Sequence, residues 1–146
     1  MRILHTSDLH IGKKLYSSDR IEEQKAFLQE LSKVCEEEQI DIVLIAGDLF
    51  DTFNPGVEAV ELLYKTLKRL TNNGKRPVIA IAGNHDSPDR IDAPDPLARE
   101  CGILMIGHPD AVIQNLKLDH FEVKNAAPGF FEIKLPQYDY PLRVVH

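Results

Sequence analysis

The chain has 146 residues, of which 43% are hydrophobic and 27% charged, and this composition is typical of one globular domain with its own core. Its formal net charge of -6 lacks the basic surplus that usually marks proteins binding the nucleic-acid backbone, although carboxylates that hold a metal ion also count in that sum. No apolar run reaches the roughly 20 residues that span a bilayer, and two cysteines make no disulfide framework, so we expect a cytoplasmic protein without membrane contact.

Three short apolar runs in the first part of the chain predict strands, the central one buried on both faces. They cover residues 3–6, 42–46 and 78–82, and each leads into polar residues, in the sequences SDLH, GDLFD and GNHD. If these strands are parallel neighbours, the polar clusters meet at the carboxyl edge of one sheet, where ligands bind in open α/β sheets.

Two helices are predicted between these strands. Asp19 and Glu22 are expected to form a reciprocal cap for the first helix, and Asn54 with Pro55 is expected to start the second. Apolar residues recur at helical spacing in both segments. The faces expected to be buried are Ile21, Phe27, Leu28, Leu31, Val34 and Cys35 in the first helix and Val57, Val60, Leu63, Tyr64, Leu67 and Leu70 in the second.

The remainder of the chain changes character. Prolines break up residues 87–96, which predicts a loop, followed by a short helix over 97–101 and a strand over 103–106. Short strand-like pieces separated by turn residues then predict an antiparallel meander; they cover residues 111–113, 116–123, 130–135 and 142–145. The expected fold class is therefore α/β, a β-α-β-α-β half followed by short antiparallel strands.

The residue types that follow the three strands favour a metal site. Asp8 and His10 are two residues apart just past a strand, so both point to the same side if the chain stays extended. Asp48 can bridge two ions roughly 3.5–4 Å apart, and Asn84 adds an amide oxygen. Carboxylate, amide oxygen and imidazole together suit Mn²⁺, Fe or Zn²⁺.

Two further residues are candidates for catalysis. His85 adjoins Asn84 and is expected to face the substrate, either as a proton donor or as a stabiliser of charge on the transferring phosphoryl group. Asp51, one short turn beyond Asp48, is expected to orient that imidazole.

Each motif also has a simple structural interpretation when it is taken alone. DxH can be a turn or cap, GDxxD a glycine turn with a capping Asp, and NHD the cap of a loop. Their order, each directly after an apolar strand, favours the metal site. His5 lies inside a predicted strand and is expected to pack in the core, whereas His108, His120 and His146 are assigned to surface loops and strands.

DLH at 8–10, GDLFD at 47–51 and GNHDSP at 83–88 resemble the motifs of the calcineurin-like metallophosphoesterase superfamily. The opening ILHTSDLHIGKKLY narrows the resemblance to the SbcD type of bacterial DNA repair nuclease subunit. This resemblance implies two divalent ions, with Mn²⁺ expected, one bound by Asp8, His10 and Asp48 and the other by Asp48 and Asn84, and it implies that His85 is the catalytic histidine. It also implies DNA as substrate, a homodimer, and an SMC-like ATPase of the SbcC type as partner.

One part of the superfamily pattern is missing. Its members complete the two metal sites with three further histidines, in an isolated His and a GHxH segment, and this chain has neither; GHPD at 107–110 comes too early and lacks the second His. We therefore expect residues 1–146 to be only the N-terminal part of a metallophosphoesterase domain. The first metal keeps three protein ligands and the second two, so this fragment is expected to hydrolyse little or nothing.

Three functions stay open at this point. The first is a metal-dependent exonuclease or endonuclease that hydrolyses DNA phosphodiesters in repair, recombination and replication. The second is a metallophosphatase acting on phosphoproteins or nucleotides with the same motifs, and the third is a non-catalytic scaffold that docks a partner. Lys13, Lys14, Arg20 and Arg90 are either contacts for substrate phosphate or ordinary surface charges.

Overall fold

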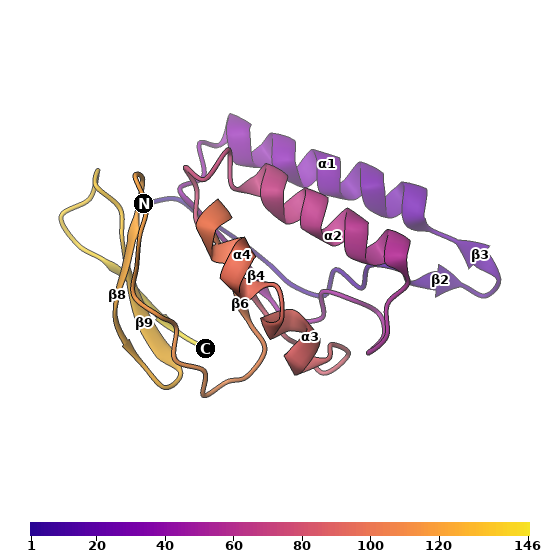
Figure 1. Cartoon of the computed structure of the whole chain (residues 1–146). Coiled ribbons are helices and arrows are strands. Elements are labelled where there is room, and N and C mark those ends of the chain that lie inside the picture. Colours follow the sequence, from indigo (N-terminus) through magenta and orange to yellow (C-terminus); the bar gives the residue numbers. More distant parts are fainter.

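The parallel sheet that the apolar runs predicted is present. The computed structural model describes residues 1–146 and contains this four-stranded sheet, in the order β1-β4-β5-β6, with every pairing parallel (Figure 1). Thr6, Ile45, Ala80 and Met105 lie in one row across it, so the strands end at a common edge. The strands are β1 (Ile3–Thr6), β4 (Ile42–Ala46), β5 (Val78–Ile81) and β6 (Ile103–Ile106).

The predicted antiparallel meander forms a second sheet, in the order β10-β9-β8-β7. Its strands are β7 (Leu116–Lys117), β8 (Glu122–Ala127), β9 (Phe130–Lys134) and β10 (Leu142–Val145). Two details of the prediction are wrong. Residues 111–113 form no strand, because Ile113 is buried from a loop, and the piece at 116–123 is divided between β7 and the start of β8.

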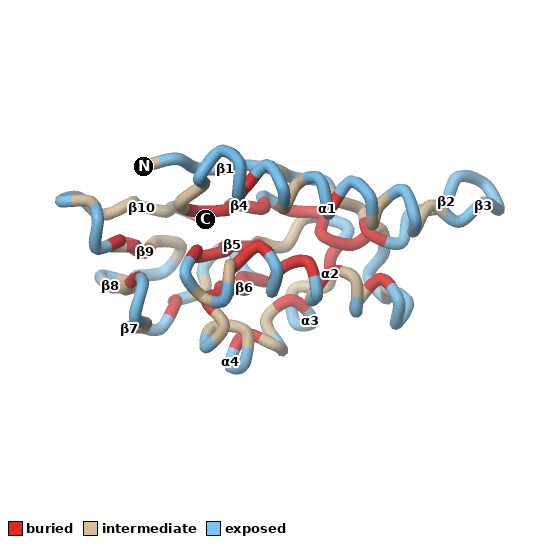
Figure 2. Tube along the Cα trace, turned by 90° about the horizontal axis from the view of Figure 1, so that it is seen from above, coloured by how far each residue is buried: buried red, intermediate tan, exposed pale blue.

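The parallel sheet is covered on both faces, and the side chains of β4 alternate between two cores. Val43 and Ile45 pack with the helices, whereas Ile42 and Leu44 pack with the second sheet (Figures 1 and 2). Mixed α/β layers of this kind confirm the expected fold class, a partial calcineurin-like sandwich. The prediction that the central strand is buried on both faces holds at its start and fails at Ala46, which is exposed.

The two long helices, α1 (Ile21–Glu37) and α2 (Val57–Leu70), pack on the outer face of the parallel sheet. The Asp19 carboxylate accepts the Ile21 N–H at 2.8 Å, but Glu22 bonds to Lys25, so the reciprocal cap is not formed. The second helix begins after Gly56 and not at Pro55, which leaves Val57 84% exposed. Phe27 and Val34, predicted to be buried, are exposed as well.

Residues 87–96 are not the loop that their prolines suggested. They contribute to two short helices, α3 (Pro88–Asp92) and α4 (Asp95–Ala98), and a 3₁₀ turn follows over Arg99–Cys101. Proline has no N–H to lose in the first turn of a helix, so Pro88 and Pro96 start helices here.

A small hairpin of β2 (Lys14–Leu15) and β3 (Ser18–Asp19) interrupts the loop predicted from residue 8 to 18, and it extends from the rest of the molecule (Figures 1 and 2). His5 is exposed and not packed in the core, because β1 is an edge strand of the sheet. Both cysteines are free thiols, and burial raises the pKa of Cys35. None of the helices combines the length and the apolar composition needed to cross a membrane.

Candidate metal centre

The loops that follow β1 and β4 run side by side at the carboxyl edge of the parallel sheet. The N–H groups of residues 8, 10 and 11 donate to the carbonyl groups of residues 47–49 at 2.9–3.0 Å. Asp8, His10 and Asp48 have positive φ angles of 55°, 42° and 49°. This conformation is uncommon outside glycine, is tolerated best by Asp, Asn and His, and concentrates at functional sites.

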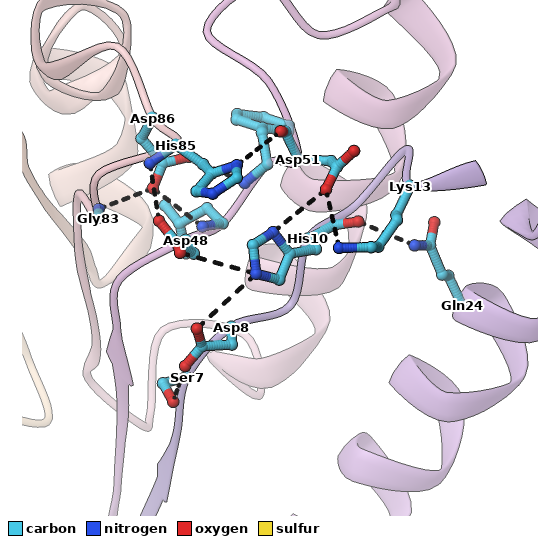
Figure 3. A network of polar contacts seen from close by, with 12 residues as sticks. Ser7, Asp8, His10, Lys13, Gln24, Asp48, Asp51, Gly83, His85 and Asp86 are labelled. Carbon is cyan, nitrogen blue, oxygen red and sulfur yellow. Dashed lines mark hydrogen bonds and ion pairs between the residues drawn. The ribbon is translucent and has the colours of Figure 1, made fainter. Parts of the chain in front are cut away.

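Three ligand-type side chains converge at these loops (Figure 3). His10 Nε2 lies 3.7 Å from Asp8 Oδ1 and 3.6 Å from Asp48 Oδ2, and all three donor atoms lie within 4.8 Å of one another. Donors bonded to one ion at ~2.1 Å lie roughly 3–4 Å apart. One imidazole and two carboxylates at this spacing therefore fit a divalent ion, whose charge would offset the repulsion between the carboxylates.

The other side of the His10 ring faces Asp51. The buried Nδ1 atom of His10 has no hydrogen-bond partner, and Asp51 Oδ1 lies 3.3 Å from it. A carboxylate behind a ligating imidazole commonly fixes the tautomer and the orientation of the ring. Lys13 Nζ lies 3.4 Å from the same Asp51 oxygen. The Asp51 carboxylate therefore faces His10, and not His85 as the sequence suggested.

His85 stands beside this cluster. Its Nδ1 lies 2.9 Å from the backbone carbonyl of Asp51, and because a carbonyl only accepts, Nδ1 carries the proton. Its ring packs edge-to-face on the ring of His10, with 4.9 Å between the centroids, and its backbone N–H donates to Asp48 Oδ1 at 2.9 Å. His85 is thus oriented by Asp51 through the backbone, with Nε2 left for another partner.

The side chain of Asn84 is exposed, and the residue lies between Gly83 and His85 in the loop that contacts Asp48. Its assignment as a ligand of a second ion remains a prediction. His5, His108, His120 and His146 take no part in the cluster.

Sequence reasoning missed two residues that hold the loops in place. The Gln24 amide of α1 donates to the His10 carbonyl at 2.9 Å and accepts the Gly12 N–H at 3.0 Å. The buried Asp86 carboxylate accepts three backbone N–H groups from the loops after β4 and β5. The interpretation of NHD as a loop cap was the available signal for Asp86; no sequence signal marks Gln24.

A cleft of about 390 Å³ opens beside the cluster, between the first loop and the start of α1. Lys13 and Arg20 line it, and Arg20 is paired with Glu23 at 2.7 Å. Lys14 lies in the hairpin, and Arg90 donates to Asn54 Oδ1 at 3.0 Å. Of the four basic residues singled out from the sequence, two therefore border the same cleft as the ligands Asp8 and His10.

Comparison with known proteins agrees with this site. Residues 1–138 match the calcineurin-like phosphoesterase family, and the chain belongs to that family. It is similar to proteins from three bacteria that are named as the SbcD component of the nuclease SbcCD. The identity is 51% over 109 residues in Bacillus subtilis (strain 168), covering 75% of this chain and 28% of that protein.

The other two relatives give the same picture. The Rhodobacter capsulatus protein is 43% identical over 108 residues, covering 73% of this chain and 27% of the relative. The Staphylococcus epidermidis protein is 44% identical over 92 residues, covering 63% and 25%. The chain spans about a quarter of the length of these relatives.

Proposed function

We propose that this chain is the N-terminal, metal-binding part of a nuclease domain that hydrolyses phosphodiester bonds of DNA, with Mn²⁺ as the expected metal. The observation that carries the proposal is the convergence of Asp8, His10 and Asp48 beside His85. The three relatives are named as part of a nuclease, SbcCD, and this name supports a nucleic acid, here DNA, as the substrate.

The residues have distinct tasks in this proposal. Two divalent ions, when bound, would supply Lewis-acid activation and neutralise phosphate charge. Asp8, His10 and Asp48 would hold the first ion, and Asp48 with Asn84 would hold the second. Asp51 would keep Nε2 of His10 directed at Asp8 and Asp48 by contacting the opposite ring nitrogen.

His85 is the candidate proton donor. Because Nδ1–H is engaged by the Asp51 carbonyl, a proton for the leaving oxygen would come from Nε2 of the imidazolium form. The same ring position also allows His85 to stabilise negative charge on the phosphoryl group. Lys13 and Arg20, at the cleft, are placed to contact a neighbouring phosphate of the strand.

The longer protein would act with partners. Its relatives are named as a component of SbcCD, which supports an SbcC-type, SMC-like ATPase as the second component. A homodimer, a role in DNA repair, recombination and replication, and a cytoplasmic location complete the proposal.

The test is hydrolysis by the full-length protein of single- and double-stranded DNA, of bis(p-nitrophenyl) phosphate and of p-nitrophenyl phosphate, with Mn²⁺ and with EDTA. We expect metal-dependent cleavage of DNA and of the diester, and its loss in Asp48→Ala. Hydrolysis of the monoester alone would instead support a phosphatase of phosphoproteins or nucleotides.

Two further outcomes would change the proposal. A folded full-length protein that hydrolyses none of the substrates would support a scaffold that docks a partner. Manganese-dependent DNA cleavage by the 146-residue chain, at the rate of the full-length protein, would contradict its assignment as an incomplete domain.

A further inference from the structure

Asp86 is a buried carboxylate at the centre of the metal-binding loops. The residue is 1% exposed, and no Lys, Arg or His lies within ion-pair distance of it. A buried charge is costly unless hydrogen bonds satisfy it. Asp86 has three: Oδ2 accepts the N–H groups of Leu49 and Gly83, and Oδ1 accepts that of Phe50, each at 2.9 Å (Figure 3).

The donors of these bonds flank the proposed metal ligands. Leu49 directly follows Asp48 in the loop after β4, and Gly83 directly precedes Asn84 in the loop after β5. One carboxylate therefore ties together the backbone on either side of the two loops. Both of its oxygens are engaged by N–H groups, so it is not itself available to an ion.

The two loops touch with no space to spare. A Cβ added at Gly83 would lie 2.1 Å from Asp48 Oδ1 and 2.2 Å from Asp48 N, and one at Gly47 would lie 3.2 Å from the Gly83 Cα. Asp48 also accepts the His85 N–H. A small change in the spacing of the loops would therefore move Asp48 relative to Asn84 and His85.

We propose that Asp86 is a positioning residue of the metal centre, whose carboxylate sets the distance between the loop of Asp48 and the loop of Asn84 and His85. This inference rests on the proposed metal centre. Loss of an outer partner of this kind typically costs 10–100-fold in metal affinity. A residue that only stabilised the fold would not change the affinity of molecules that remain folded.

The test measures Mn²⁺ binding to the full-length protein by the electron paramagnetic resonance signal of free Mn²⁺, at a temperature where circular dichroism shows each variant to be folded. Asp86→Asn removes one acceptor oxygen and turns an NH₂ group toward a backbone N–H. Asp86→Glu keeps the charge but displaces the carboxylate by one methylene. We expect both variants to bind Mn²⁺ about 10–100-fold more weakly.

Asp95→Asn is the matched control, because Asp95 is a buried carboxylate that accepts the Met105 N–H of β6 and pairs with Arg99, away from the metal loops. We expect it to lower the unfolding temperature without changing Mn²⁺ affinity.

Four outcomes would overturn the inference. They are wild-type affinity in Asp86→Asn, weakening in Asp86→Asn but not in Asp86→Glu (which would indicate an effect of charge alone), equal weakening in Asp95→Asn, and failure of both Asp86 variants to fold. Absence of Mn²⁺ binding by the wild-type protein would overturn the proposed metal centre itself, and this inference with it.

Discussion

At the scale of single residues, Asp48 and His85 lie in contact but differ in what they offer. Asp48 directs Oδ2 at His10 and uses Oδ1 to accept the His85 N–H, so it is both a candidate ligand and a contact between loops. His85 presents an imidazole whose Nδ1–H is already committed. The two residues should therefore be separable by mutation.

We expect His85→Ala in the full-length protein to lower DNA hydrolysis by ~10²–10⁴ while metal stays bound, because a proton donor contributes about this factor. Asp48→Ala should lose both metal and activity. Metal titration and cleavage assays on the same preparations distinguish the two. Equal loss of metal in both variants would mean that the roles are misassigned.

Gly83 gives a second prediction at this scale. Gly83→Ala places a methyl group against the Asp48 backbone and carboxylate, and overpacking of this kind typically costs about 1–3 kcal/mol or more. Gly56→Ala is the control, since a Cβ there meets nothing within 4 Å. Urea unfolding should show a large loss of stability only for Gly83→Ala. Similar values for the two variants would contradict the close approach of the loops.

At the scale of secondary-structure elements, α1 supports the first metal loop from the side. Gln24 bonds to both Gly12 and His10, so the helix holds the turn that carries the imidazole. Asp86 plays the equivalent part for the other two loops. Each loop of the site is thus held by a side chain that touches no proposed ligand atom.

Gln24→Ala should lower the free energy of unfolding by about 1–3 kcal/mol, since two hydrogen bonds are lost at roughly 0.5–1.5 kcal/mol each. It should also weaken metal binding, because His10 loses its support. The control is Gln29→Ala, an exposed position on the same helix. Thermal unfolding and Mn²⁺ titration measure the two effects. An unchanged metal affinity would show that the turn keeps its shape without Gln24.

At the scale of the whole molecule, Asp41 links the two sheets. Burial alone would raise the pKa of this carboxyl. Hydrogen bonds from the Arg2 backbone at 2.6 Å, Tyr138 at 2.7 Å and Gln137 at 3.3 Å, with the nearby N-terminal ammonium, outweigh burial and hold the pKa below its usual 3.8. A carboxyl with a lowered native pKa stabilises the fold above its unfolded pKa and loses that contribution as pH falls.

We therefore expect the stability difference between the wild-type chain and Asp41→Asn to be largest above pH 3.8 and to shrink as pH falls below it. Urea titrations on both sides of that pH measure the difference. Asp119→Asn, at an exposed position, serves as the control. A difference that grew toward acid pH would contradict the sign of the shift.

Much of the architecture follows from local pattern. Apolar runs at 42–46 and 78–81 are strands because β-branched residues suit a pleated, buried surface, and DLH, GDLFD and GNHD follow strands whose carboxyl ends must meet in a parallel sheet. The spacing alone therefore brought Asp8, His10 and Asp48 to one place. The prolines at 88 and 96 misled because a proline breaks a helix in its interior and starts one in its first turn.

The tertiary structure alone decided the contacts between segments distant in sequence. The sequence by itself determined which residues could ligate a metal, since residue type sets donor chemistry. It did not determine that the Asp51 carboxylate faces His10, that Gln24 holds the first loop, or that Asp86 joins the other two. Each of these depends on the distance between loops brought together by strand pairing, and no local propensity encodes such a distance.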